Sequence, residues 1–176
     1  MLTFLPQPII FAHRGASAYA PENTLAAFEQ ALIQGADGIE LDAKLSADGH
    51  VVVIHDATLD RTTGVHGRVK DLSLADLQAL NAGSFFSNNF STETIPALEE
   101  VFESFGKKLF INVELTNYNT PRDHLVETVC MLVKKFNLQK LKSPLINNGL
   151  LPDRSYYCFI IFCITCSPLL LITCII

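Results

Sequence analysis

Short apolar runs alternate with amphipathic segments through most of the chain. Four runs have the length and the β-branched content of strands, and they cover residues 9–12, 38–45, 50–54 and 109–115. Three segments have the apolar spacing or the end signals of helices, and they cover residues 24–34, 96–104 and 120–137. Because strands alternate with helices, the pattern favours a parallel α/β fold.

The segment from 57 to 95 interrupts this alternation. It is rich in Gly, Ser and Asn. Ser73 stands where an N-cap residue would, and Asp76 occupies the capping-box position three residues later. The segment is therefore predicted to be an excursion from the strand–helix pattern that contains one short helix.

Acidic residues occupy one face of two predicted strands. Glu40 and Asp42 are two residues apart in an alternating segment, so they project from the same side. Such a pattern is also typical of a half-exposed edge strand with a solvated acidic face. Glu114, at the end of another apolar run, is a third carboxylate. Because like charges placed side by side are costly without a compensating cation, the three carboxylates favour a divalent-cation site.

Two histidines follow apolar runs, where the chemistry of a parallel α/β barrel collects. His13 comes after the first run and His55 after the third. Two imidazoles offer a general acid and a general base, and Arg14 offers a planar fork for a phosphate. Together with the carboxylates, these residues indicate metal-assisted hydrolysis of a phosphodiester. The remaining histidines have no such context and are interpreted as surface residues: His50, His66 and His124.

Three further polar residues have two interpretations each. Glu22 and Asn23 precede a predicted helix, so they either cap it or contact substrate or metal. Arg61 is either a cation of the catalytic face or a loop anchor paired with Asp56 or Asp60, and the anchor is favoured.

Five motifs then carry a family resemblance. They are His13-Arg14-Gly15, Pro21-Glu22-Asn23-Thr24, Glu40-x-Asp42, His55-Asp56 with Leu59, Arg61, Thr62 and Thr63, and Val113-Glu114-Leu115. In this order they resemble the N-terminal part of the glycerophosphodiester phosphodiesterase family, over residues from about 9 to 138. The resemblance implies a TIM-type (β/α) barrel of the phospholipase-C-like phosphodiesterase type, with residues 57–95 as a small insertion after the second barrel strand.

The resemblance also implies an activity and roles for individual residues. The family hydrolyses glycerophosphodiesters, small molecules of lipid and glycerol metabolism, to glycerol 3-phosphate and an alcohol with Ca²⁺ or Mg²⁺. Glu40, Asp42 and Glu114 match the metal ligands, and Arg14 matches the phosphate contact. His13 and His55 match the acid–base pair, without assigning acid and base between them. Thr116 stands where many members have a lysine.

Two alternatives remain from the sequence. A related lysophospholipase D or sphingomyelinase D shares similar histidine and carboxylate motifs. A non-catalytic protein, either anchored by its tail or simply degraded, is the alternative from a different functional class.

Length and composition narrow these choices. The chain has 176 residues and a net charge of -5 without a basic cluster, which argues against a nucleic-acid partner. Three of the four predicted strands are barrel strands, because the run at 50–54 is a paired run that follows the Asp48-Gly49 turn. A full barrel takes about 250 residues, so an incomplete barrel without substantial activity is expected. The first eleven residues lack the charged region of a signal peptide, so we expect a cytoplasmic protein.

The last segment differs in character from residues 1–142, which form the enzyme-like part. Residues 143–176 are apolar and cysteine-rich: residues 156–176 contain no charged side chain and four of the five cysteines. A stretch of this length would span a bilayer, giving membrane association. The abrupt loss of pattern and the sudden cysteine richness instead favour translation in a non-native frame or a wrongly assigned gene end, and that interpretation is preferred.

Overall fold

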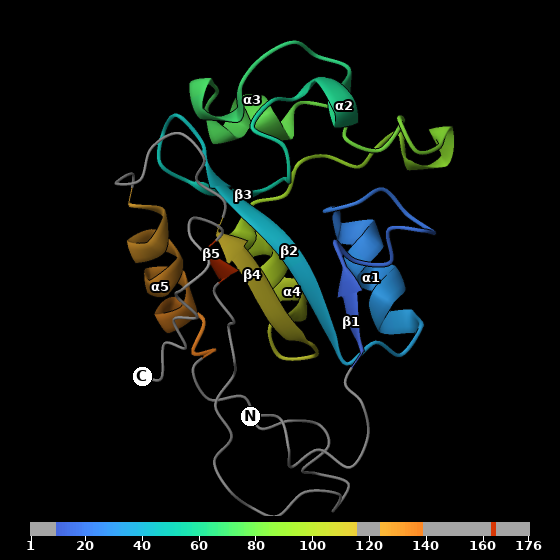
Figure 1. Cartoon of the computed structure of the whole chain (residues 1–176), viewed down its shortest axis with the longest axis vertical. Helices are drawn as coiled ribbons and strands as arrows, with labels where there is room; N and C mark the ends of the chain where they lie inside the picture. Colours follow the sequence, from blue (N-terminus) through green and yellow to red (C-terminus); the bar gives the residue numbers. More distant parts are fainter. Residues whose placement is uncertain (1–9, 116–123, 139–162, 165–176) are drawn as a thin grey trace, which may run out of the picture.

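The computed structural model describes residues 10–115, 124–138 and 163–164, and these form a mixed sheet covered by helices (Figure 1). The sheet order is β1-β2-β4-β5, with β3 on the end of β2. The parallel strands are β1 (Phe11–His13), β2 (Gly38–Leu45), β4 (Phe110–Leu115) and β5 (Cys163–Ile164). The remaining strand is β3 (Val51–Val53), which is antiparallel to β2.

Among the described residues, three helices pack on one side of the sheet. They are α1 (Leu25–Ile33), α4 (Leu98–Phe105) and α5 (Leu125–Lys135). Their buried side chains, such as Phe28, Phe102 and Val129, share one hydrophobic core with Leu41 and Ile111 of the sheet. Because side chains alternate along a strand, the residues between these apolar positions face the opposite side of the sheet.

The segment between β3 and α4 forms a small insertion with its own core. It contains α2 (Asp60–Thr63), η1 (Val69–Asp71), α3 (Leu74–Gln78) and η2 (Asn88–Phe90). Its second apolar cluster includes Leu59, Val69 and Leu77, packed with Val52 of β3. Figure 1 shows the insertion beyond the ends to which β1, β2 and β4 point. The insertion therefore adjoins the end of the sheet where the predicted site residues lie.

Helix-start signals are only partly where the sequence places them. The capping box of Ser73 and Asp76 is present at α3, as predicted. Thr24, rather than Glu22 or Asn23, is the N-cap of α1, where its side-chain oxygen accepts a hydrogen bond from the Ala27 amide. The capping interpretation of Glu22 and Asn23 is therefore wrong, and both side chains are engaged elsewhere.

The predicted element bounds hold best in the centre of the sheet. The strand predicted at 38–45 is β2 to the residue, while β1 begins and ends later than the predicted 9–12. The predicted helix start at 120–121 lies outside the described residues, and α5 begins at Leu125. Of the tail, only β5 is described. Among the residues described, no helix combines the length and apolarity that a bilayer crossing requires.

Candidate active site

Strand register brings the three predicted carboxylates together. His13 of β1 lies opposite Glu40 of β2, and Asp42 lies opposite Glu114 of β4. Glu40, Asp42 and Glu114 each offer a carboxylate oxygen, and these oxygens lie within 4.8 Å of one another. The sequence prediction that the carboxylates share a face and meet is confirmed.

Asp42 is the most deeply buried carboxylate of the cluster, while Glu114 is partly exposed. Asp42 is only 1% exposed. Burial raises the pKa of Glu40 above its usual value, with the Asp42 charge adding to the effect, although the Arg14 backbone N–H opposes it. Asp42 Oδ1 and Asn112 Oδ1 are buried without a hydrogen-bond partner among the described residues. Hard oxygen donors that converge and lack partners fit a divalent cation such as Ca²⁺ or Mg²⁺.

Arg14 sits in a turn that points it at this cluster. Its φ of 57° and the φ of 78° at Gly15 turn the chain directly after β1. A Cβ on Gly15 would lie 2.7 Å from the Ala27 backbone, so only glycine allows the turn to approach α1 this closely. The Arg14 amide donates to Glu40 Oε2 at 3.0 Å. Its guanidinium Nε lies 3.4 Å from Asp42 Oδ2, which places a cation beside the carboxylates.

Asn23 holds Asp42 from the other side. Its Nδ2 donates to Asp42 Oδ2 at 2.9 Å, and its Oδ1 accepts from the Asp42 amide at 3.4 Å. Asn23 is buried and has a φ of 57°, a left-handed conformation that asparagine tolerates better than most residues. It therefore orients one oxygen of Asp42 and leaves Oδ1 for another ligand.

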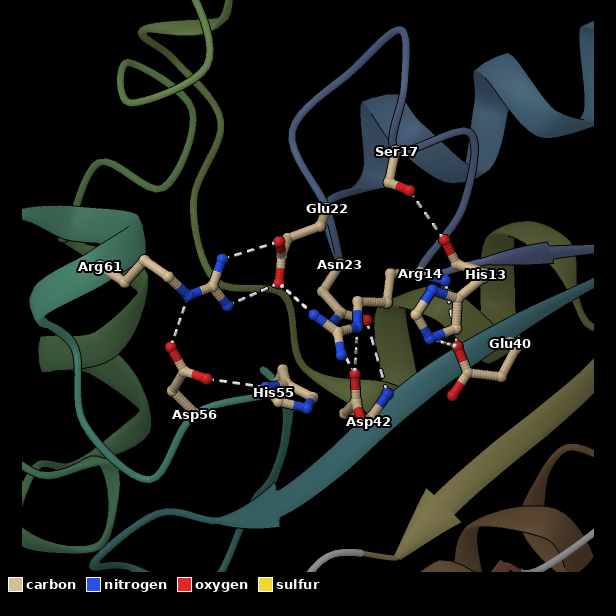
Figure 2. A network of polar contacts seen from close by, with 10 residues as sticks. All are labelled: His13, Arg14, Ser17, Glu22, Asn23, Glu40, Asp42, His55, Asp56 and Arg61. Atoms are coloured by element: carbon tan, nitrogen blue, oxygen red, sulfur yellow. Dashed lines mark hydrogen bonds and ion pairs between the residues drawn. The ribbon is translucent and has the colours of Figure 1, made fainter.

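The two candidate acid–base histidines occupy different surroundings. The His13 side chain is 69% exposed, and its Nε2 lies 3.8 Å from Glu40 Oε2. His55 is more enclosed, and its Nδ1 lies 2.7 Å from Asp56 Oδ1. In the view of Figure 2 they lie on opposite sides of Arg14 and Asp42. His66, interpreted from sequence as a surface residue, is exposed and pairs only with Asp60 among the described residues.

Arg61 of the insertion is an anchor, as predicted. Of the two predicted partners, Asp56 and Asp60, it binds Asp56. It also binds Glu22, which no sequence argument identified because the two residues are far apart in the chain. Hydrogen bonding to Arg61 lowers the pKa of Glu22, with Arg14 adding to the effect. Burial alone would raise the pKa of Asp56, but hydrogen bonds from Arg61 and His55 lower it overall. Both groups are therefore carboxylates at neutral pH.

Two more polar residues on the acidic face were not singled out from sequence. Lys44 of β2 is buried on the side of Asp42, and burial lowers its pKa against the opposing effect of Asp42, Asp56 and Glu114. Asn112 of β4 lies opposite Glu40. The same two-residue alternation that identified Glu40 and Asp42 would have placed both side chains here.

Taken together, the described residues bring together groups that phosphodiester chemistry uses. Three carboxylates could hold a divalent cation, a guanidinium can bind phosphate oxygens, and imidazoles can accept and donate protons. No other described group of histidine, cysteine and carboxylate side chains is arranged to hold a metal ion.

Comparisons with known proteins point the same way. Residues 13–143 match the family model for glycerophosphoryl diester phosphodiesterases. A glycerophosphodiester phosphodiesterase of Caldanaerobacter subterraneus is 46% identical over 133 residues, which cover 75% of this chain and 55% of that protein. The chain spans about half the length of the curated relatives it matches.

Solved structures extend the likeness to the fold. A glycerophosphodiester phosphodiesterase from Agrobacterium tumefaciens is 36% identical with a TM-score of 0.70, over 82% of this chain and 62% of its own. A phosphodiesterase from Oleispira antarctica, solved in complex with the product sn-glycerol-3-phosphate, is 37% identical with a TM-score of 0.69. That alignment covers 76% of this chain and 54% of the other.

Proposed function

Because the chain belongs to the glycerophosphoryl diester phosphodiesterase family, we propose that its site serves the hydrolysis of glycerophosphodiesters to glycerol 3-phosphate and an alcohol. The observation that carries the proposal is the convergence of Glu40, Asp42 and Glu114 on one face of the sheet, with Arg14 beside them. The product bound to the Oleispira antarctica phosphodiesterase supports the choice of substrate class.

Glu40, Asp42 and Glu114 would hold the divalent cation, Ca²⁺ or Mg²⁺. When bound, the cation supplies positive charge to the phosphoryl oxygens. Asn23 keeps Asp42 in place by donating to its Oδ2. The donor set supports this assignment, because it is composed of carboxylate oxygens and includes the unpartnered Asp42 Oδ1.

Arg14 would bind the phosphate of the substrate. Its Nη1 donates to Glu22 at 3.0 Å, and this contact aims the guanidinium across the face that carries the carboxylates. As the oxygen bond to phosphorus forms, negative charge grows on the phosphoryl oxygens, and a fixed guanidinium stabilises that charge.

His13 and His55 would move the protons. One imidazole removes the proton from the attacking hydroxyl, of water or of the glycerol moiety, as that oxygen bonds to phosphorus. The other donates a proton to the ester oxygen as its bond to phosphorus breaks, so the alcohol leaves neutral. Attack by water gives glycerol 3-phosphate directly, whereas attack by the glycerol hydroxyl gives a cyclic phosphate that water must then open to glycerol 3-phosphate.

We also propose that the 176-residue chain alone does not turn over substrate. Three of the described parallel strands, β1, β2 and β4, carry the site, whereas a closed barrel has eight. Ligands from two strands must be held to within about 0.5 Å for catalysis, and closure of a barrel supplies that rigidity.

A substrate panel tests the activity. The chain is assayed alone and after co-expression with the C-terminal half of the Caldanaerobacter subterraneus relative, using glycerophosphocholine, lysophosphatidylcholine and sphingomyelin. We expect release of glycerol 3-phosphate from glycerophosphocholine by the complemented preparation only, abolished by EDTA. Glu114→Gln in the complemented preparation is the matched control. Preference for sphingomyelin or lysophosphatidylcholine would contradict the substrate class, and full activity in EDTA would contradict the metal.

A further inference from the structure

The Arg61 guanidinium donates three hydrogen bonds to two carboxylates from different segments of the chain. Its Nη1 and Nη2 donate to Glu22 Oε2 and Oε1 at 2.8 Å each, a two-pronged contact. Its Nε donates to Asp56 Oδ2 at 2.7 Å. Glu22 precedes α1, and Asp56 follows His55. The guanidinium therefore links the segment before α1 to the segment after His55 (Figure 2).

The carboxylate of Asp56 in turn contacts His55. Its Oδ1 lies 2.7 Å from His55 Nδ1, while its Oδ2 accepts from Arg61. A carboxylate is only an acceptor, so the short contact requires that Nδ1 carry the proton. In the neutral imidazole, Nε2 is then the nitrogen without a proton.

We propose that Arg61, clamped by Glu22, is a positioning residue that fixes the ring orientation and the tautomer of His55 through Asp56. The inference rests on the proposed function, in which His55 moves a proton. Arg61 itself touches none of the candidate metal ligands among its described contacts.

A surface ion pair would be worth little, but this contact differs in two ways. The Arg61 side chain is 44% exposed, whereas the Glu22 side chain is 16% exposed, so the salt bridge ends in a partly desolvated carboxylate. Three directed bonds from one planar group also fix its plane. The Asp56 carboxylate is therefore held at both oxygens and cannot rotate away from the imidazole.

The insertion does not depend on Arg61 for its own fold. Leu59 and Val69 are buried in the insertion core on either side of Arg61. Gly64, at a φ of 71°, ends α2 in the left-handed conformation that favours glycine. Replacing Arg61 should consequently leave the insertion folded, and a change at His55 can be assigned to the lost contacts.

The test reads the tautomer of His55 directly and needs no turnover. The 176-residue chain is labelled with ¹⁵N-histidine, and the two ring nitrogen shifts of His55 are assigned with His55→Gln. We expect protonated Nδ1 in the wild-type chain. Arg61→Gln should move the ring toward the mixture of tautomers of a free histidine, and Arg61→Lys should restore part of the wild-type signal because it keeps the charge without the two-pronged contact. Arg68→Gln, at an exposed arginine of the same insertion, should have no effect.

The His55 tautomer in the two Arg61 variants decides the proposal. A His55 tautomer that is wild-type in both Arg61→Gln and Arg61→Lys overturns the proposal, even if thermal stability falls, because a purely structural contact would lower stability alone. If Arg61→Gln does not fold, the Arg61→Lys spectrum decides by the same criterion. The phosphodiesterase assay can fail without changing this spectrum, so failure of the proposed function and failure of the positioning inference are distinguishable.

Discussion

The two faces of strands β2 and β4 share one backbone and one register, yet they are built for different purposes. On the helix side, Leu41 and Ile111 lie fully in the hydrophobic core. On the other side, Asp42 and Glu114 stand opposite each other as like charges. Apolar burial on the first face stabilises the fold. On the second face, burial raises the pKa of Glu40, which means that the charged group is destabilised there. A shift of one residue along a strand separates stability from chemistry.

The largest expected effect concerns the charged face. Glu40→Gln or Glu114→Gln should abolish binding of Ca²⁺ or Mg²⁺. Mutating a residue that only supports a metal ligand lowers metal affinity by ~10–100-fold, and removing the ligand itself should lower the affinity further. Without added cation, neither substitution should lower the unfolding temperature, since each removes one of the repelling charges. Titration calorimetry and thermal unfolding measure the two properties. Cation binding equal to that of the wild-type chain would remove the metal assignment.

Next in size is the loss of proton transfer. In a preparation that turns over glycerophosphocholine, His13→Ala and His55→Ala should each lower kcat by about 10²–10⁴-fold. Their thermal unfolding should change little, because neither ring lies in the apolar core. Steady-state kinetics measure the effect. A variant with kcat near the wild-type value would identify its histidine as structural.

The apolar face should show the reverse pattern. Ile111→Ala should lower the free energy of unfolding by about 2–5 kcal/mol through a buried cavity, while the folded fraction still binds the cation. The control is Met131→Ala, at a side chain on α5 that is 62% exposed, where a change within about 0.5 kcal/mol is expected. Chemical denaturation measures both. Equal costs for the two variants would mean that the helix-facing side is not the stabilising one.

The smallest effect is a pH dependence at the edge of the charged face. The pKa of Glu22 is lower in the folded chain than its model-compound value of 4.5, so its contribution to stability is present above that pH and is lost as pH falls through the folded value. Glu22→Gln should cost up to about 1 kcal/mol at pH 7, and the difference from the wild-type chain should shrink below about pH 4. Denaturation at several pH values measures it. If the stability difference between Glu22→Gln and the wild-type chain grew as the pH fell, the predicted direction of the pH dependence would be wrong. Glu40, with a raised pKa, contributes in the opposite direction.

The sequence predicts the charged face well because the relevant physics is local. Alternation along β2 places Glu40 and Asp42 on one side, and parallel strands bring Glu114 to the same end of the sheet. Asp56 as a partner of Arg61 is also a local prediction, since the two residues lie a few positions apart.

Contacts made by folding over long distances were beyond sequence reasoning. Asn23 binds Asp42 across 19 positions of the chain, from a backbone in the left-handed conformation that its sequence context did not indicate. The pairing of Glu22 with Arg61 depends on how the insertion is seated. Within the described part of the chain, the two residues of β5 beside Glu114 and Leu115 were likewise not predicted as a strand.

One backbone hydrogen bond near the end of β2 joins the candidate metal site to the segment that leads into the insertion. The amide of Ile54 donates to the carbonyl of Asp42 at 2.9 Å. A candidate metal ligand and the residue before a candidate acid–base histidine are thus tied together by main chain, ahead of the insertion. Because this backbone contact precedes the insertion, it does not involve the insertion residues, whereas the ring of His55 is linked to the insertion through Asp56 and Arg61. A different insertion grafted after this contact would therefore keep the backbone at Ile54 in place, and it would need an arginine at the position of Arg61 to keep the contact with Asp56.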